Sequence, residues 1–386
     1  MAGAWRLMGG RKALKRLFVP SRRFSVSLID TNEVLGLKSC IVKNINASVL
    51  RMQGKDSKKF LQDFTSNDIS RLDIEPALYT GWLNRKGRYL YDSIVLKGME
   101  QDEFFLICES TTVPNLSRHI KIFNIRSEVK VTDISKEVNV WNYLSTDADA
   151  LSKVVEMQGK TRGDNDSISL GVIDPRRSKG SDLDRRESLM GTIVICPIDT
   201  QPIVPESTPS VELDVLEAYR MWRGIPRDTV ELIKEESLIL EANFDWIDGV
   251  SFSKGCYLGQ ELTARSHHTG VIRKRLMPVR IIPEGESINE VKSFQRAQPT
   301  DHLFPEFFDG TMDIAVEENA AIKSTPLNGS GRAKSAGKLM SIVGNIGIAQ
   351  VRLKESQQEN VILKCDNLSL LPIVPTWWPS DEVWNV

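Results

Sequence analysis

The chain has few of the features that identify the common protein classes. Its five cysteines are odd in number and never form a C-x-x-C pair, which argues against a disulfide framework or a self-contained zinc site and favours a reducing compartment. The formal net charge is −1, so no excess of positive charge indicates nucleic acid or anionic lipid as a partner. No run approaches the roughly 18 uninterrupted apolar residues that a membrane-spanning helix needs. We therefore expect no nucleic-acid partner and no membrane span.

The usual catalytic and nucleotide-binding motifs are also missing. The sequence contains no G-x-G-x-x-G before a helix, no P-loop, no G-x-S-x-G elbow and no H-E-x-x-H. These absences exclude the usual nucleotide-binding, serine hydrolase and zinc protease interpretations.

The N-terminal segment differs in composition from the rest of the chain. Its first 28 residues contain seven arginines and lysines and no acidic residue. The apolar residues among them are spaced to lie on one side of a basic helix, which is typical of a mitochondrial transit peptide. We predict that residues 1–24 are a presequence and that the mature chain begins near Ser25 in the mitochondrial matrix. A disordered basic tail is the alternative interpretation.

Hydrophobic patterns predict strands and helices in mixed order, without a regular βαβ repeat, which indicates an α+β fold. Strands are expected in 41–54, at 104–109, and on both sides of a turn at 84–87. Helices are expected after Asp56, at 115–123 and at 211–223.

Two polar stretches interrupt this pattern. Residues 161–188 and 284–336 are rich in charged residues and Ser, and we expect them to be irregular insertions, the first facing solvent. After the second stretch, residues 346–354 and 361–365 are expected to be strands of a small β-barrel or sandwich.

The most unusual segment surrounds Cys256. Gly255 and Gly259 allow the backbone there to turn tightly and leave the thiol accessible. The Lys254 ammonium nearby would favour the thiolate, which is the form that binds metal. A buried, inert packing cysteine is the alternative. No second cysteine lies nearby in sequence, so iron bound by Cys256 would need its other ligands from a partner chain or a small thiol.

The run K-G-C-Y-L-G-Q-E at 254–261 resembles the K-G-C-Y-x-G-Q-E signature of the YgfZ-type proteins. These are relatives of the glycine-cleavage T-protein (aminomethyltransferase) that assist iron–sulfur cluster assembly. The similarity extends over about residues 41–282 and is typical of the mitochondrial branch. The resemblance implies an essential motif, with Cys256 as the metal ligand, Lys254 favouring its thiolate, and Gln260 and Glu261 shaping the loop. The motif consists of Lys254, Gly255, Cys256, Tyr257, Gly259, Gln260 and Glu261.

The same resemblance implies a T-protein-like, multi-module α+β fold around a central folate-type cavity, with a C-terminal β-barrel. It divides the chain into a presequence at 1–24, a folate-binding region at 25–282 and a barrel module at 283–386.

Two departures from the T-protein pattern concern its carboxylates. Tyr91 stands where T-protein has a catalytic Asp, and Trp222 stands where it has a Glu. A phenol and an indole cannot supply those carboxylates, so we do not expect aminomethyl transfer. The residues implied for tetrahydrofolate in the cavity are Tyr91, Asp92, Arg220, Trp222 and Glu241.

The resemblance therefore implies a non-classical assembly factor of the mitochondrial matrix that supports maturation of [4Fe–4S] proteins. Cys256 would act at an interface with an A-type iron–sulfur carrier or scaffold protein, with an iron–sulfur cluster shared between the two chains. We expect the protein alone to be a monomer. A folate-dependent one-carbon (aminomethyl) transferase and a cofactor-free interaction module are the alternatives.

Overall fold

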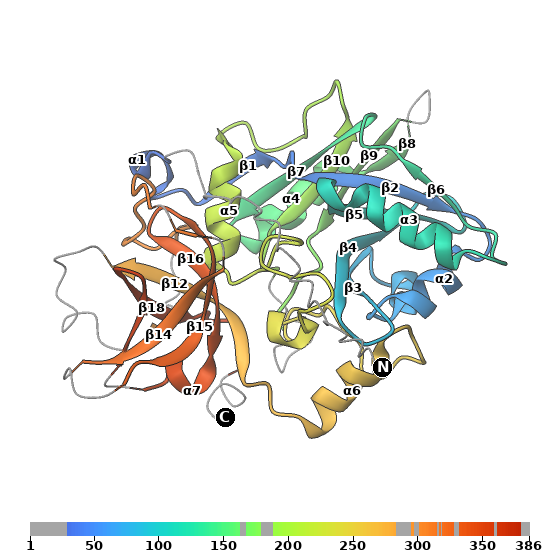
Figure 1. The fold of residues 1–386 in the computed structure, drawn as a ribbon. Coiled ribbons are helices and arrows are strands. Elements are labelled where there is room, and N and C mark those ends of the chain that lie inside the picture. The colour runs from blue at the N-terminus through green and yellow to red at the C-terminus, as the bar shows by residue number, and fades with distance from the viewer. Residues whose placement is uncertain are drawn as a thin grey trace, which may run out of the picture.

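The computed structural model describes residues 29–162, 167–178, 188–282, 295–296, 301–314, 316–317, 319–327, 332–358 and 361–379. Within these residues the chain forms two β-sheets with helices packed on them and a C-terminal β-barrel (Figure 1). The mixture of strands and helices confirms the predicted α+β class. The predicted presequence at 1–24 lies outside the described residues.

One antiparallel sheet has the strand order β3-β4-β5-β2-β6 and carries α2 and α3 on one face (Figure 1). Alternate side chains of its strands join Phe60 of α2 and Leu116 of α3 in a separate core. The helix start expected at Asp56 is confirmed, but the Asp56 carboxylate accepts from the Glu128 N–H at 2.7 Å instead of capping the helix. The elements are β2 (Ala47–Gln53), α2 (Ser57–Phe64), η1 (Ile69–Asp73), β3 (Ala77–Leu83), β4 (Tyr89–Lys97), β5 (Glu103–Glu109), η2 (Ser110–Thr112), α3 (Val113–Phe123) and β6 (Lys130–Asp133).

The other sheet has the strand order β11-β1-β7-β10-β9-β8, and α4 packs against β7, β9 and β10. The prediction that 161–188 faces solvent is wrong for β9, because Leu170 and Val172 are buried in this sheet and Asp174 is buried just after it. The elements are β1 (Ser39–Lys43), β7 (Val138–Ser145), α4 (Ala148–Gln158), β8 (Lys160–Arg162), β9 (Ile168–Ile173), β10 (Thr192–Pro197) and β11 (Ser210–Val211).

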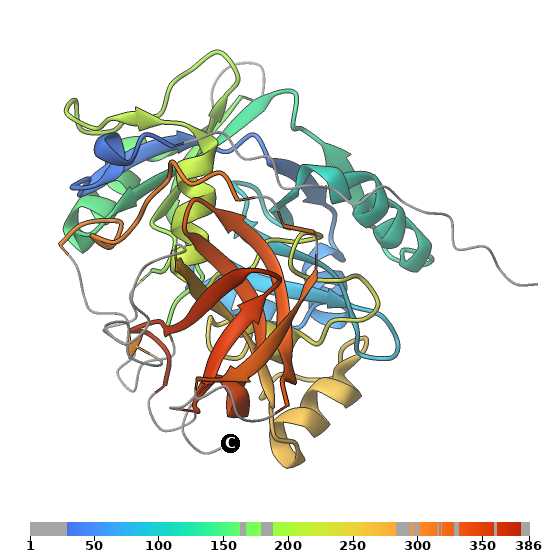
Figure 2. The ribbon, with the colours of Figure 1, turned by 60° about the vertical axis from the view of Figure 1, so that its left-hand side comes forward.

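Helix α5 (Leu213–Trp222) stands between the sheets and the barrel, as the turned view shows (Figure 2). It contacts β1 on one side and β15 and β16 on the other. Every residue from Val215 to Trp222 is therefore buried, although the sequence pattern predicts a helix with one apolar side. The remaining elements before the barrel are α1 (Thr31–Val34), η5 (Ile239–Ala242) and α6 (Gln260–Thr269).

The C-terminal module is a closed barrel, which confirms the predicted β-barrel. Its strand order is β12-β16-β15-β14-β17-β18, and β12 also pairs with β18, which closes the sheet. The predicted boundary at 282/283 falls at the end of β12, and the stretch at 284–336, expected to be irregular, contributes β14. The elements are β12 (Lys274–Ile282), β13 (Gln295–Arg296), β14 (Ala320–Pro326), β15 (Lys334–Val343), β16 (Ile346–Arg352), α7 (Leu353–Ser356), β17 (Val361–Cys365) and β18 (Leu368–Val374).

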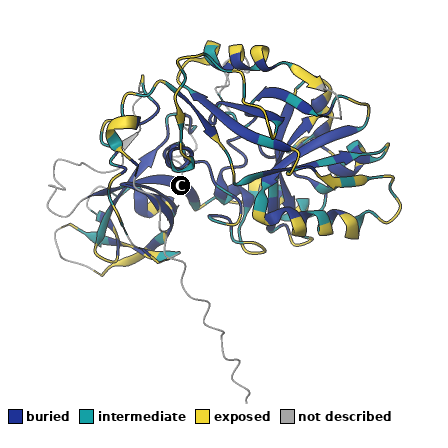
Figure 3. Ribbon diagram, turned by 90° about the horizontal axis from the view of Figure 1, so that it is seen from above, coloured by how far each residue is buried: buried dark blue, intermediate teal, exposed yellow. Residues whose placement is uncertain are grey.

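The largest hydrophobic core runs through all of these parts and includes Tyr79 of one sheet, Ile193 of the other and Leu276 of the barrel. Buried residues accordingly dominate the strands, while exposed residues follow the outer sides of the helices (Figure 3). Across the described residues, no helix has the length and apolar character required to cross a membrane.

Candidate functional site

Cys256 is the exposed thiol among the five cysteines, all of which lie in the described residues. Cys40, Cys108, Cys196 and Cys365 are buried. Burial raises the pKa of the Cys40 thiol to about 12 and that of Cys365 to about 11, so these groups stay protonated at neutral pH. The sequence-based expectation of an accessible thiol at Cys256 agrees with this placement, and the packing-cysteine alternative does not.

Lys254 holds the loop that carries Cys256 against the end of α2. Its buried Nζ donates to the carbonyl oxygens of Gln62 at 2.6 Å, Thr65 at 2.8 Å and Asn67 at 2.7 Å. Burial lowers the pKa of Lys254 to about 8, with nearby carboxylates opposing the shift, so the ammonium form persists at pH 7. The three N–H groups are thus directed at backbone oxygens, which gives Lys254 the role of anchoring the loop.

The segment that leads into this loop is held by Ser66 and Asn67, which belong to the run S-N-D. The Ser66 hydroxyl donates to the Gly249 carbonyl at 2.7 Å. The Asn67 side-chain amide donates to the carbonyls of Asp248 and Tyr79 at 2.7 and 2.8 Å. Since Tyr79 lies in β3, these contacts fix the loop relative to the sheet.

The far end of the loop is fixed by close backbone packing. The Leu258 N–H donates to the Asp63 carbonyl at 2.9 Å. Gly259 has a φ of +82°, and a Cβ added to it would lie 2.4 Å from the Asn84 carbonyl oxygen. Glycine is therefore required at 259, whereas a Cβ at Gly255 would meet nothing within 4 Å. Residues 251–258, here called the Cys256 loop, are thus fixed at both ends with the thiol between them.

The other motif residues support the same loop. Tyr257 is buried, its ring lies 4.9 Å from the Lys254 Nζ, and its N–H donates to Gln260 Oε1 at 3.3 Å. Gln260 thus binds the backbone of the loop through its side chain. Glu261 is exposed in the first turn of α6, where a negative charge is favourable to the helix.

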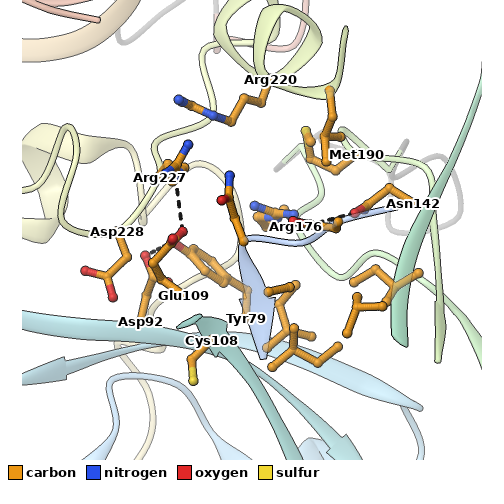
Figure 4. A pocket seen from close by; sticks show the side chains of 18 of the residues that line it. Tyr79, Asp92, Cys108, Glu109, Asn142, Arg176, Met190, Arg220, Arg227 and Asp228 are labelled. Atoms are coloured by element: carbon orange, nitrogen blue, oxygen red, sulfur yellow. Dashed lines mark hydrogen bonds and ion pairs between the residues drawn. The ribbon is translucent and has the colours of Figure 1, made fainter. Parts of the chain in front are cut away.

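A cavity of about 100 Å³ lies where the two sheets and α5 meet. Tyr79, Asp92, Glu109 and Asp228 gather on one side of it, and Arg176 and Asn142 lie across from them (Figure 4). The cavity is thus lined by carboxyl, guanidinium and amide groups together with apolar side chains.

Tyrosine hydroxyls donate to the two aspartates of the cavity, the half-buried Asp92 and the buried Asp228. Tyr79 donates to Asp92 Oδ2 at 2.9 Å, and Tyr89 donates to Asp228 Oδ1 at 2.5 Å. Burial raises the pKa of both aspartates, as does their mutual repulsion for Asp228. Burial also raises the pKa of Glu109 to about 7, although Arg227 opposes the shift. This side of the cavity therefore retains protons at a pH at which exposed carboxyls have lost them.

Arg176 is a cavity residue that the sequence pattern did not indicate. It pairs with Asp174 through two hydrogen bonds of 2.9 and 2.6 Å and lies 5.7 Å from the Tyr79 ring. It belongs to the charged run after β9 that was expected to face solvent. The only sequence signal for its burial is the apolar strand immediately before it.

Of the five residues implied for the cavity, the structure places Asp92 and Arg220 in its lining. Arg220 is buried and already donates to Glu217 at 2.6 Å, to Glu231 at 2.9 and 3.1 Å and to the Ile225 carbonyl at 3.3 Å. Arg220 therefore shapes the wall of the cavity by tying its elements together.

Tyr91, Trp222 and Glu241 lie elsewhere, which corrects their predicted positions in the cavity. Successive residues of β4 alternate between the two faces of the sheet, so Tyr91 points to the opposite face from Asp92, where its hydroxyl accepts from Lys234 Nζ at 2.7 Å. The Trp222 ring packs against Phe307 with ring centres 5.6 Å apart. Glu241 accepts from the Gln350 amide of β16 at 3.0 Å.

Two family models match the chain. One, described as the GCVT N-terminal domain, matches residues 43–154, and the other, described as the CAF17 C-terminal beta-barrel domain, matches residues 273–380. Both matches fit the modules seen in the structure and confirm the T-protein-like fold with its C-terminal barrel.

Several curated proteins resemble the chain over most of its length. It is 30% identical over 379 residues to a Mycosarcoma maydis protein named iron-sulfur cluster assembly factor IBA57 homolog, mitochondrial, an alignment that covers 89% of this chain and 85% of the other. It is 28% identical over 394 residues to the Mus musculus protein named iron-sulfur cluster assembly factor IBA57, mitochondrial, covering 97% and 94%. Among solved structures, glycine cleavage system aminomethyltransferase T from Bartonella henselae aligns with a TM-score of 0.60 at 12% identity, covering 88% and 85%, which shows a shared fold.

Proposed function

The chain belongs to the family of the mitochondrial iron–sulfur cluster assembly factor IBA57, and from that premise we propose that it assists iron–sulfur cluster assembly through Cys256. The observation that supports this most is the placement of one exposed thiol on a loop fixed at both ends. A ligand held in this way loses little conformational freedom when it binds a metal.

The cluster is cargo in this proposal and is shared with an A-type iron–sulfur carrier protein during maturation of [4Fe–4S] proteins. Cys256 supplies one thiolate to iron, and its proton leaves to solvent when the bond forms. Iron–sulfur clusters are commonly held by four cysteine thiolates, so the carrier or a small thiol supplies the other ligands. This division explains why one accessible thiol is sufficient on this chain.

Visible absorption tests the proposal directly. The purified chain is mixed with an A-type carrier protein, iron and sulfide, and the spectrum is compared with the spectra of the separate proteins. We expect a new absorption band that is absent with Cys256→Ser, which keeps the shape of the side chain but removes the soft ligand. Cys196→Ala, at a buried cysteine, is the control and should retain the band. Loss of cooperative folding in Cys256→Ser would contradict a ligand role for the thiol.

Tetrahydrofolate is the proposed occupant of the cavity. The half-buried Asp92 carboxyl fits the N–H groups of a pterin, and the Asn142 amide lies across the cavity from it. Bound tetrahydrofolate would supply a one-carbon or redox-active centre, while Asp92 and Asn142 would orient the pterin. Calorimetry with tetrahydrofolate should detect binding that weakens in Asp92→Asn, and no binding to the wild-type chain would refute this part.

Folate-dependent aminomethyl transfer is the second candidate. The observation in its favour is that Asp92, the second carboxylate of the T-protein turn, still lines the cavity. Tyr91, at the first carboxylate, lies on the other face of the sheet with its hydroxyl bound to Lys234. We expect no turnover in a one-carbon transfer assay, and turnover by the wild-type chain would favour the enzyme over the assembly factor.

The mitochondrial matrix is the proposed location. Its support is the basic, acid-free segment at 1–28 and the word mitochondrial in the names of the relatives. N-terminal sequencing of the protein from isolated mitochondria should give a start near Ser25, and an intact Met1 would refute the presequence.

A further inference from the structure

The segments around Cys256 are positively charged in a chain whose net charge is −1. Residues 84–88 and 250–269 together contain five lysines and arginines and one acidic residue, Glu261. Lys254 is buried, so the charges that reach the surface belong to Arg85, Lys86, Arg88 and Arg265, here called the basic surface.

Close packing brings these two distant segments together. A Cβ added to Gly87 would lie 2.8 Å from the Gly259 carbonyl oxygen and 2.6 Å from the Leu262 Cβ. The turn that exposes Arg85 and Lys86 therefore lies beside the start of α6, directly after the Cys256 loop. Arg265 follows Leu262 by three residues and so lies on the same side of α6 as Leu262. In Figure 1, α6 lies at the lower edge of the molecule, away from the barrel.

The acidic groups near this surface leave the charges of Arg85 and Lys86 in place. Asp63, whose carbonyl binds the Cys256 loop, forms an ion pair with Lys59 on α2, so that pair is neutral as a whole. Glu261 is exposed at the start of α6, four residues before Arg265 on the same side of the helix, so it offsets the Arg265 charge. Arg88 donates to the backbone oxygen of Glu236 at 2.8 Å, which leaves the Arg88 charge in place and brings the Glu236 carboxylate to the margin of the surface.

We propose that the basic surface docks an acidic face of the protein that shares the cluster with Cys256, an inference that rests on the proposed function. A cluster held by four thiolates carries a net negative charge, so a partner that presents one is anionic at the point of contact. Fixed cations within a Debye length of about 10 Å stabilise such a charge and accelerate the encounter. The thiol and the basic surface thus act on the same partner, one as ligand and the other as docking site.

Charge reversal tests this docking site. The double variant Arg85→Glu/Lys86→Glu is compared with Lys136→Glu/Lys153→Glu, which reverses two exposed lysines outside the basic surface. Association of the full chain with a purified, cluster-loaded A-type carrier is followed by stopped flow at low and high salt, after thermal unfolding has shown that both variants fold. We expect the first variant to associate about 10-fold more slowly at low salt, to approach the wild-type rate at high salt, and the control to change little.

The outcomes separate the docking site from the proposed function. Equal association rates for the wild-type chain and the Arg85→Glu/Lys86→Glu variant at low salt overturn the docking site. If the wild-type complex still shows the absorption of a shared cluster, the proposed function stands. A wild-type chain that forms neither complex nor cluster overturns both. Binding to an RNA oligonucleotide or to anionic vesicles that is tighter than binding to the carrier also overturns the docking site, because it assigns the charge to another partner.

Discussion

Replacing Lys254 with methionine should loosen the Cys256 loop while the rest of the chain stays folded. Methionine keeps most of the length and the apolar stem of lysine, but it lacks the ammonium that donates to the carbonyls of Gln62, Thr65 and Asn67. These carbonyls lie at and beyond the end of α2, where the last turn of a helix leaves acceptors without intrahelical partners. The substitution therefore removes the side-chain contact between the loop and that helix end and leaves the backbone bond from Leu258 to Asp63.

The expected loss of stability follows from opposing contributions. A hydrogen bond that involves a charged group contributes about 1.5–3 kcal/mol, so the ammonium gains roughly 4.5–9 kcal/mol from its three bonds. Burying the ammonium costs several kcal/mol in lost hydration, which offsets most of this gain. We expect the free energy of unfolding to fall by about 2–3 kcal/mol in Lys254→Met. A folded protein normally tolerates a loss of that size.

Local and global effects are measured separately. Amide hydrogen exchange at Ser251 and Leu258, whose N–H groups hold the two ends of the loop, should become faster in Lys254→Met. Alkylation of Cys256 should also change rate, while urea unfolding reports global stability. Lys59→Met makes the same substitution at an exposed lysine of α2 and should leave exchange and alkylation unchanged.

Unchanged exchange and alkylation in Lys254→Met would show that the ammonium does not hold the loop. A shift of the alkylation profile to higher pH, with unchanged exchange, would instead support thiolate stabilisation by Lys254. Lys254→Arg separates the two accounts further, because it keeps the charge but replaces a compact ammonium with a planar fork that does not match three carbonyls.

Three further predictions concern the loop, the cavity and the enzyme alternative. Gly259→Ala places a Cβ at a φ of +82° and 2.4 Å from the Asn84 carbonyl, so urea unfolding should show a loss of about 2–4 kcal/mol, and a loss below about 0.5 kcal/mol would contradict the packing. Because burial raises the pKa of Glu109 from 4.5 to about 7, the folded chain binds more protons than the unfolded chain between these values, and stability should fall by up to about 3 kcal/mol as pH rises through this window. The raised pKa of Asp228 continues that fall toward pH 8, so Asp228→Asn should flatten it in unfolding curves, and an unchanged slope would refute the assignment. Tyr91→Asp should not create aminomethyl transfer in a one-carbon assay, because residue 91 points away from the cavity, and any turnover would show that this side chain reaches it.

Local sequence patterns were sufficient for elements whose periodicity and turns are unbroken. The turn expected at 84–87 joins β3 to β4, and the helix expected at 115–123 lies within α3. Local sequence patterns failed at β9, because this short apolar strand lies between two charged runs, and the high charge of the whole stretch indicated a polar loop. The pair of the partly buried Arg176 with the buried Asp174 explains the error, since sequence does not reveal that two neighbouring charges neutralise each other in the fold.

The candidate site was predictable only in part, for a geometric reason. The motif indicated an accessible Cys256. The carbonyl acceptors of Lys254, however, lie 187 to 192 residues away in sequence, so the anchoring role of Lys254 could not be predicted from the motif. Similarly, Tyr91 and Asp92 are neighbours that face opposite sides of β4. Strand alternation predicts that only one of them reaches the cavity, but which face of the sheet borders the cavity is decided by the packing of segments distant in sequence.

The ion network around Arg220 has a consequence for how this protein can change during evolution. Arg220 of α5 binds Glu231, and Glu231 in turn accepts from the Ser341 hydroxyl of the barrel strand β15. A barrel exchanged with that of a distant relative would have to bring a hydroxyl to position 341, or Glu231 would lose that partner. Positions 231 and 341 should therefore be inherited as a pair, and barrel and sheets should diverge together instead of recombining as independent modules.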